Sequence, residues 1–259
     1  MNNWLFHHYD VQKGMYFDNL NEDGELYYFS SDMINDSVWN YGLVSRITKD
    51  SLEKYIIFCN SIGKATNLYI PHKTSFDDRI LLDLGFIRPE SDDGILVTET
   101  WMKFTHKKYV VKAKCNIKEV VTQEEKKQFI DVFLAAYGGE KTPEKPYGDL
   151  PVEYTDALSR SFFNSKFHHF ICYNEIGNPV SVASLCMNDG YGGLYNIGTP
   201  PAYEKNGFGL AVTDACINKW FELNGKELFL QTETGTGIDS WYNRIGFENL
   251  FFGSIYEKQ

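Results

Sequence analysis

Short apolar runs separated by turn residues predict a group of strands in the second half of the chain. Runs at 167–173, 180–187 and 193–198 have the length and the apolar content of strands. The segments between them, 174–179 and 188–192, are rich in Asn and Gly and are too short for a crossover helix. These strands are therefore predicted to form an antiparallel meander.

Apolar residues at helical spacing predict helices before and after this meander. Thr122 and Glu125 form a capping box ahead of the apolar residues at 129–137, so a helix is predicted to begin there. A second helix is predicted over about 152–164 and a third over 207–223. The meander is thus flanked by helices in the order of the chain.

After the third helix the chain is predicted to return to a strand, a short helix and a last strand. Residues 227–232 are typical of a buried strand, and the short helix begins at 239 and ends at Gly246. The last strand is predicted at 250–256. Helices around a mostly antiparallel sheet indicate the α+β class.

The order of these elements has a weaker counterpart in the first part of the chain. In each part a strand ends near a glycine, a helical segment and a strand follow, and a Gly-Phe pair precedes a last strand. The corresponding segments are 39–44 and 195–200, 67–70 and 227–230, 84–86 and 245–247, and 95–104 and 250–256. We predict two halves, 1–106 and 107–259, that meet in the polar run at 105–108. The alternative is a chance likeness of two α/β segments.

The segment 192–210 is the main candidate for a binding site. A strand ends at a Gly/Pro break, and the loop that follows opens into a helix through Gly207 and Gly209. Glycines let a ligand approach the backbone, and free N–H groups at a helix N-terminus attract anions. The pattern predicts a phosphate site, with a purely structural turn as the alternative. It lacks the Gly-Lys-Ser/Thr of a P-loop and the third glycine of a dinucleotide fingerprint.

Composition and charge narrow the partners of such a site. The net charge of −10 argues against nucleic acid or an anionic membrane surface as the main partner. The 5 cysteines form no Cys-x-x-Cys pair, which indicates reduced thiols in a cytoplasmic protein without a metal site. We expect no signal peptide and no transmembrane span. The sequence leaves the oligomeric state open.

Two motifs, in this order, resemble those of the GCN5-related N-acetyltransferase (GNAT) family. The run Tyr195-Asn-Ile-Gly-Thr-Pro-Pro-x-Tyr-x-x-x-Gly-x-Gly209 resembles its acetyl-CoA-binding motif. The run Trp241-Tyr-Asn-Arg-Ile-Gly-Phe247 resembles its Tyr-x-x-x-Gly-Phe signature. The resemblance covers residues 115–259 and implies a mixed sheet in which two neighbouring strands splay apart around acetyl-CoA. With the repeat, it implies two GNAT-like halves, each a mixed, mostly antiparallel sheet flanked by helices.

The resemblance also implies an N-acetyltransferase in which an amine attacks acetyl-CoA directly. Tyr242, three residues before Ile245, is the implied general acid toward the leaving thiolate. Backbone N–H groups at a bulged strand end would hold the oxyanion, and those at the helix start would hold the pyrophosphate. The residues implied to bind the cofactor are Ile197, Gly198, Thr199, Lys205, Asn206, Gly207, Phe208, Gly209, Leu210 and Thr234.

Two positions depart from the family pattern. Glu204 stands where Gln or Arg is preferred, and an acidic side chain beside a pyrophosphate weakens binding unless it points away. Gly235 stands where the family often has Asn, seven residues before Tyr242, and Thr234 is the candidate replacement. We therefore expect weaker, rather than absent, cofactor binding.

The general base is not evident from the sequence. Glu233 is the first candidate, because it leaves the strand opposite the implied acetyl site. A chain of water molecules is an alternative. His168 and His169 alternate in a strand, so one is expected in the core and the other in solvent. The other candidates are Glu153, His168, His169 and Asp189.

The N-terminal half differs where the chemistry is expected. It has no Gly-x-Gly after Gly42, and Leu81 stands at the position that corresponds to Tyr242. We predict that this half binds no CoA and is structural or shapes the acceptor pocket. The acceptor, a small or peptide amine, is expected near the loop 138–151, with a solvated loop as the alternative. The residues considered for a cation there are Tyr137, Glu140, Glu144 and Tyr147.

A different class of function is a non-catalytic acetyl-CoA-binding regulatory module, which Glu204 suggests. Tyr242 favours the enzyme, because a binding module needs no general acid. A nucleotide-binding fold is disfavoured by the antiparallel meander that precedes the loop.

Overall fold

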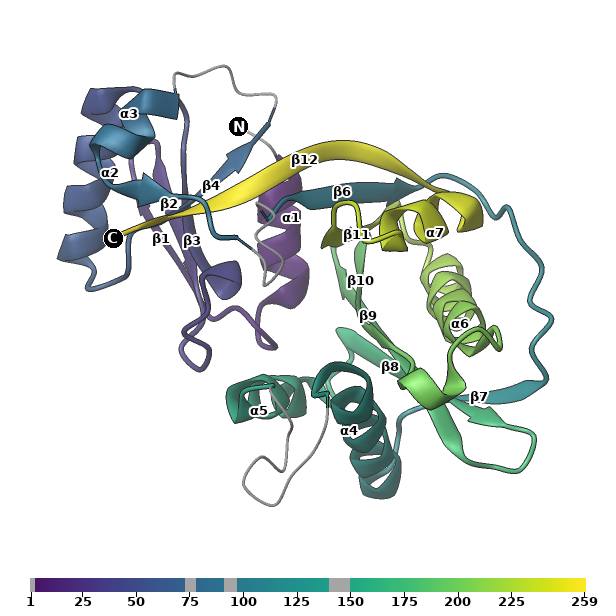
Figure 1. Ribbon diagram of the computed structural model, residues 1–259. Helices are drawn as coiled ribbons and strands as arrows, with labels where there is room; N and C mark the ends of the chain where they lie inside the picture. The colour runs from purple at the N-terminus through teal and green to yellow at the C-terminus, as the bar shows by residue number, and fades with distance from the viewer. Residues whose placement is uncertain (1–2, 73–77, 91–96, 140–149) are drawn as a thin grey trace. The chain divides into compact units, whose positions relative to one another are not determined.

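The computed structural model describes residues 3–72, 78–90, 97–139 and 150–259, and the chain divides into two compact units (Figure 1). The first unit consists of Met1–Tyr9, Tyr16–His106 and Gln231–Gln259. The second consists of Asp10–Met15 and Lys107–Leu230. The last residues of the chain therefore belong to the same unit as most of the first hundred.

The second unit is an antiparallel meander with helices on both sides (Figure 1). Its strands, in order across the sheet, are β7 (Cys115–Glu119), β8 (Phe167–Asn174), β9 (Pro179–Asn188) and β10 (Tyr191–Gly198). Its helices are α4 (Gln123–Tyr137), α5 (Val152–Ser161) and α6 (Phe208–Glu222), and η2 (Pro201–Tyr203) is a single 3₁₀ turn. Because α4 and α6 both pack on β9, this strand is buried along most of its length.

The first unit is a mixed sheet that takes in the C-terminal strand. Its strands, in order, are β1 (Asn19–Asp23), β2 (Leu26–Ser30), β3 (Asn40–Val44), β4 (Asn67–Pro71), β12 (Phe247–Lys258) and β6 (Glu99–Phe104), with β5 (Phe86–Ile87) on β12. Its helices are α1 (Asn3–Gln12, as far as Tyr9), α2 (Lys49–Ser61), α3 (Asp78–Asp83) and α7 (Ile238–Ile245), and η1 (Ser37–Trp39) is a 3₁₀ turn. β11 (Glu227–Glu233) begins in the second unit and ends in the first.

Alternating side chains along β2 give the first unit two apolar faces. Tyr28 packs with Tyr55 of α2 and Leu81 of α3 in one core. Phe29 packs against Phe6 of α1, with ring centroids 5.3 Å apart. Successive side chains of a strand point to opposite faces, so helices cover both faces of this part of the sheet.

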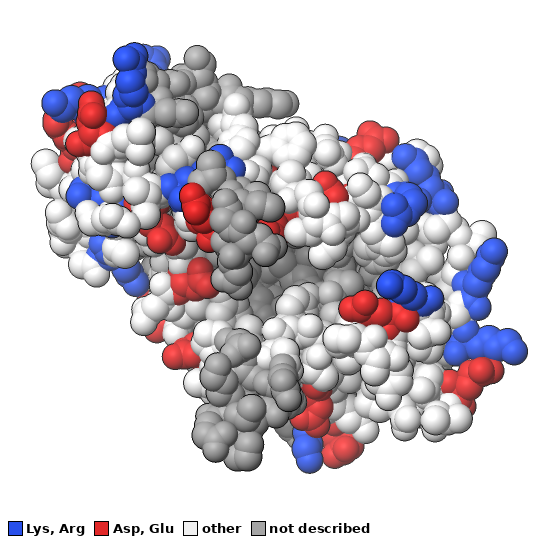
Figure 2. Space-filling view, in the orientation of Figure 1, with Lys and Arg blue, Asp and Glu red and all other residues white. Residues whose placement is uncertain are grey.

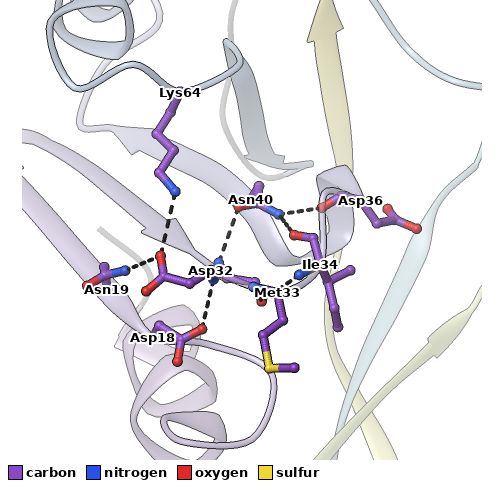
Figure 3. Close-up of polar contacts among 9 residues, drawn as sticks. Asp18, Asn19, Asp32, Met33, Ile34, Asp36, Asn40 and Lys64 are labelled. Carbon is purple, nitrogen blue, oxygen red and sulfur yellow. Dashed lines mark hydrogen bonds and ion pairs between the residues drawn. The ribbon is translucent and has the colours of Figure 1, made fainter. Parts of the chain in front are cut away.

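The connection between β2 and β3 is held by its own polar side chains (Figure 3). The Asp32 carboxylate accepts a hydrogen bond from Asn19 at 2.7 Å, and the Asp32 backbone N–H donates to Asp18 at 2.8 Å. The Asn40 side chain donates to the Asp36 carbonyl oxygen at 2.9 Å. These contacts fix the start of β3. We therefore give Asp18, Asp32 and Asp36 a structural role.

Charge is distributed over the visible surface. On the face in Figure 2, Lys and Arg side chains lie among Asp and Glu side chains. The net charge of −10 is the sum of 25 basic and 35 acidic residues. Within the described residues, no helix has the length and apolar character needed to cross a bilayer.

The structure confirms the α+β class and the predicted elements of the meander and its helices. α4 begins after Thr122, which forms the predicted capping box with Glu125. α5 ends at Ser161, earlier than predicted, and Phe163 just beyond it has a φ of +64° that no helix can continue. α1, β1 and β2 were not predicted. The boundary at 106/107 stays a prediction, because each compact unit combines several segments.

Candidate functional site

The strands β10 and β11 separate after a short paired stretch. They pair in parallel from Tyr191 to Gly193 on β10, opposite residues 227–229 of β11. From Leu194 onward, the pairing recorded for β10 in the described residues is with β9. The expected splaying of two neighbouring strands is therefore observed.

A bulge interrupts β10 just before the strand ends. Its register against β9 shifts between Tyr195 and Gly198, and Asn196 has a φ of +53°. Gly198 packs so closely on α4 that a Cβ there would lie 2.8 Å from the Cβ of Ala136. Because a bulge turns backbone groups out of the hydrogen-bond ladder, the N–H groups of 197–199 are suited to the role implied for them.

The loop after β10 enters α6 without a side-chain cap. Gly207 is the N-cap, with a φ of +81°, and no side chain bonds to the first turn. Lys205 also has a positive φ, of +63°. The backbone N–H groups of 205–210 have no hydrogen-bond partner among the described residues. They are therefore available to an anion, which the helix dipole also favours.

Thr199 connects the end of β10 to the start of α6. Ser181 on β9 donates to the Gly198 carbonyl oxygen at 3.0 Å, and the Thr199 hydroxyl lies 2.8 Å from the Ser181 oxygen. A Cβ on Gly209 would lie 3.2 Å from Thr199 Oγ1. The second unit thus brings together the cofactor residues predicted at the strand end and at the helix start.

The remaining loop residues hold the turn or face solvent. The Asn206 side chain donates to the carbonyl oxygens of Tyr203 and Glu204, at 3.2 and 3.0 Å, and so stabilises the loop. Glu204 and Lys205 are exposed, while Phe208 and Leu210 are half-buried. The exposure of Glu204 allows water to solvate its charge, which reduces the expected penalty beside a pyrophosphate.

The corresponding helix start in the first unit is closed by side chains. Thr48 caps α2 and forms a capping box with Ser51. Tyr55 lies against Gly42 of β3, and its hydroxyl donates to the Asn67 carbonyl oxygen on β4 at 2.5 Å. Side chains thus cap the start of α2, whereas the start of α6 has no side-chain cap. The absence of a cofactor site from the N-terminal half stays a prediction.

A cavity of about 650 Å³ beside α2 is lined mainly by polar side chains. Its charged residues are Asp23, Glu25, Arg46, Asp50 and Lys54, so acidic groups outnumber basic ones. Lys54 pairs with Asp50 at 2.8 Å. This lining is unfavourable for a phosphate group.

Tyr242 lies on α7 in the first unit and is 7% exposed. Its ring packs against Trp241 and Phe247, with centroids 4.8 and 5.6 Å away. Gly246 ends α7 with a φ of +111°, as the Gly-Phe motif predicts. The corresponding Leu81 is 1% exposed in an apolar core.

Glu233 and Thr234 also lie in the first unit, at the end of β11. Glu233 is exposed. The backbone N–H of Thr234 donates to the Thr98 carbonyl oxygen at 2.8 Å, and its hydroxyl lies 2.8 Å from that of Thr100. The roles proposed for these residues and for Tyr242 stay predictions.

The two histidines differ from the expectation of one buried and one solvated side chain. His169 is 2% exposed, and burial lowers its pKa to about 3. The His168 side chain is 12% exposed, and its Nδ1 lies 2.6 Å from a carboxylate oxygen of Glu119. The second part of that expectation is wrong, because the neighbouring strand β7 supplies a partner. Glu153 and Asp189 are exposed.

The loop considered for the acceptor lies mostly outside the described residues. Glu140, Glu144 and Tyr147 fall in 140–149. Tyr137 is described, and its hydroxyl donates to the Ile197 carbonyl oxygen at 2.8 Å, so it supports the bulge. In the described part of the chain, no group of three His, Cys, Asp or Glu side chains is placed to hold a metal ion.

Sequence reasoning did not single out Ser181, Ser184 or Asn196, which hold the end of β10. The available signal was the Asn-x-Gly pattern at the end of a strand, because asparagine tolerates a left-handed conformation. Ser181 and Ser184 carried no signal, since a serine in a strand is common.

Known proteins resemble the chain at two levels. Residues 133–247 match the family model described as "Acetyltransferase (GNAT) family". No curated protein sequence matches the chain. Several solved structures share its fold across most of its length.

One such structure is a conserved protein of unknown function from Staphylococcus epidermidis, with a TM-score of 0.66 and 13% identity over 94% of each chain. A GCN5-related N-acetyltransferase from Kribbella flavida has a TM-score of 0.62 and 16% identity, over 93% of this chain and 89% of that one. A tandem GNAT protein from the clavulanic acid biosynthesis pathway has a TM-score of 0.51 and 10% identity, over 89% of this chain and 77% of that one.

These likenesses, at low identity, show the fold. They confirm the predicted α+β architecture of two GNAT-like halves. The family model covers the bulged end of β10, the loop, α6 and the Tyr-x-x-x-Gly-Phe motif. Residues 133–247 therefore match the GNAT family model, with 133–230 in the second unit and 231–247 in the first.

Proposed function

We propose that this protein is an N-acetyltransferase that moves an acetyl group from acetyl-CoA to an amine. The observation that carries the proposal is the open start of α6, where the N–H groups of 205–210 have no partner among the described residues. This helix start comes one loop after the bulged end of β10. Both lie in the segment that matches the family model. In the free protein water can satisfy these exposed donors, and a bound phosphate group would replace that water.

The two groups of backbone donors suit the two polar parts of acetyl-CoA. The N–H groups of 205–210 would hold the pyrophosphate, aided by the helix dipole. Those of 197–199 would pair with the pantetheine amides and with the acetyl carbonyl oxygen. No metal is needed for either contact.

The reaction is a direct transfer. The amine lone pair attacks the thioester carbonyl carbon, and the tetrahedral oxyanion accepts hydrogen bonds from the bulge. The C–S bond then breaks, the electron pair goes to sulfur, and Tyr242 donates its proton to the thiolate. The nitrogen becomes positively charged when it attacks, and it releases a proton to Glu233 or to water. The products are the acetylated amine and CoA.

The acceptor is a small-molecule or peptide amine, and the N-terminal half is proposed to shape its pocket. The negative net charge favours a cationic acceptor. All 5 cysteines are free, which fits a reducing compartment such as the cytoplasm.

The alternative is a regulatory module that binds acetyl-CoA without turnover, which the acidic Glu204 on the loop favours. Calorimetric titration with acetyl-CoA and a CoA-thiol release assay with a panel of amines separate the two. Binding together with amine-dependent CoA release supports the enzyme, and binding without release supports the module. If acetyl-CoA neither binds nor raises the unfolding temperature, both proposals are wrong.

Gly207→Ala is expected to weaken acetyl-CoA binding about tenfold. An alanine at a φ of +81° is strained, by about 1–2 kcal/mol, and relief of that strain re-aims the next N–H groups. The matched control is Gly177→Ala in the β8–β9 turn, where φ is +84° and space is open. Both variants should lose similar stability in urea titrations. Equal affinities for acetyl-CoA would contradict the placement of the pyrophosphate.

A further inference from the structure

A chain of hydrogen bonds runs through the second unit from α5 to the bulge of β10. The Asn196 side chain donates to Ser184 Oγ at 3.1 Å. Ser184 Oγ lies 2.8 Å from Nδ1 of His169, and His169 Nε2 lies 2.9 Å from Ser161 Oγ. Ser161 in turn donates to the Leu158 carbonyl oxygen at 2.6 Å.

The chemistry of these groups fixes the direction of each proton. Ser161 has one hydroxyl proton, which it gives to Leu158, so it must accept from His169. His169 Nε2 therefore carries the proton and Nδ1 is an acceptor. Ser184 donates to Nδ1 and accepts from the Asn196 amide. Each hydroxyl is thus satisfied as donor and acceptor, and the imidazole has one tautomer.

Burial keeps this network intact. Ser161 and Ser184 are fully buried and His169 is 2% exposed. Burial lowers the pKa of His169 to about 3, so the ring stays neutral across the physiological range. Both ring nitrogens are already engaged, so His169 is unsuited to the role of general base considered for it.

The end of the network is the residue that shapes the bulge. Asn196 has a φ of +53°, which costs a non-glycine residue about 1 kcal/mol unless local contacts favour it. The bond to Ser184 is such a contact. The register of β10 against β9 shifts in this segment, and the N–H groups of 197–199 follow directly.

We propose that His169 and Ser184 are positioning residues of the acetyl site, which hold Asn196 in its left-handed conformation and so aim the backbone N–H groups of 197–199. The inference rests on the proposed function. His169 and Ser184 act only through Asn196 and touch no reacting atom.

Ser184→Ala removes the Ser184 Oγ acceptor of Asn196 with little change in volume and leaves the longer contact of the Asn196 amide with Met15 Sδ, at 3.9 Å. We expect kcat to fall about tenfold, while the dissociation constant for CoA rises less than kcat falls, because the proposed pyrophosphate contacts at the helix start are unchanged. In an Asn196→Gly background the same substitution should change kcat less than twofold, because glycine adopts a positive φ without an anchor. Thr155→Ala, which removes another buried hydroxyl in this unit, is the stability control and should leave kcat unchanged.

Two readouts need no turnover. The strong NOE between the amide and α protons within Asn196, which a positive φ gives, should be present in the wild type and weaken in Ser184→Ala. Side-chain ¹⁵N shifts should show His169 with the proton on Nε2. The proposal is overturned if this NOE is unchanged in Ser184→Ala, or if kcat falls equally in the Asn196→Gly background. Absence of turnover with every amine would instead remove the proposed function.

Discussion

Replacement of Tyr242 by phenylalanine is expected to lower kcat by about 10²-fold to 10³-fold, the usual loss when a general acid is removed. The variant keeps the ring contacts with Trp241 and Phe247, so the fold and the affinity for acetyl-CoA should be preserved. The variant loses the phenol hydroxyl, which is the proposed proton donor to the leaving thiolate. Steady-state CoA release and calorimetric titration with acetyl-CoA measure the two quantities separately.

Tyr173→Phe is the matched control for this experiment. Tyr173 is 8% exposed and its hydroxyl donates to the Gln128 side-chain oxygen at 2.6 Å, so this variant likewise loses the hydroxyl of a buried tyrosine. It should keep wild-type kcat. Unchanged turnover in Tyr242→Phe would show that another group protonates the thiolate, while loss of acetyl-CoA affinity in that variant would indicate a structural role.

Glu99→Gln is expected to stabilise the protein above neutral pH, by about 3 kcal/mol at the plateau, which is the shift from 4.5 to about 7 at ~1.4 kcal/mol per pH unit. Glu99 lies on β6 and is 8% exposed, and its Oε2 has no hydrogen-bond partner among the described residues. Burial raises the pKa of this carboxyl, and hydrogen bonds with Tyr69, Gln231 and Trp101 oppose the rise.

The sign of this effect follows from the two states of the carboxyl. Below pH 4.5 both the folded and the unfolded chain carry the proton, so Glu99 and glutamine are equivalent. As pH rises toward 7, the unfolded chain releases the proton while the folded chain keeps it, and the free energy of unfolding of the wild type falls. Above pH 7 both states are ionised and the difference between wild type and variant is constant.

Urea unfolding of wild type and variant at several pH values measures this difference, and the ¹³C shift of the Glu99 carboxyl measures its titration directly. Glu22→Gln, at an exposed position on β1 of the same unit, is the control for the loss of a surface carboxylate. A Glu99 carboxyl that titrates near its ordinary value, together with a pH-independent difference in stability, would show that the site is better hydrated than its burial indicates.

The local elements were predictable because their signals are local. The capping box of Thr122 and Glu125 starts α4, and Gly246 ends α7, since each depends on neighbouring backbone groups alone. The loop before α6 was predictable for the same reason, because Gly207 takes a positive φ that a helix start without a side-chain cap tolerates. The segment 1–38 gave no comparable signal, and α1, β1 and β2 were missed.

The packing of distant segments was not predictable. The sequence places 247–258 at the end of the second half, yet β12 pairs with β4 and β6 in the first unit. Register between strands far apart in the chain depends on how their faces pack, and no local pattern records it. The prediction of a solvent-exposed histidine beside His169 was wrong for the same reason, because Glu119 of β7 contacts His168 across the sheet.

The sequence by itself determined the family resemblance, the α+β class and the glycine start of α6, because glycines, caps and apolar periodicity act over a few residues. Only the tertiary structure decided that the start of α6 has no side-chain cap, while Thr48 caps α2 and Tyr55 lies between β3 and β4. It also decided that His169 is a buried, neutral link to Asn196 rather than a base. Burial and hydrogen-bond partners arise from packing between segments, and they set both the protonation state and the backbone conformation at the site.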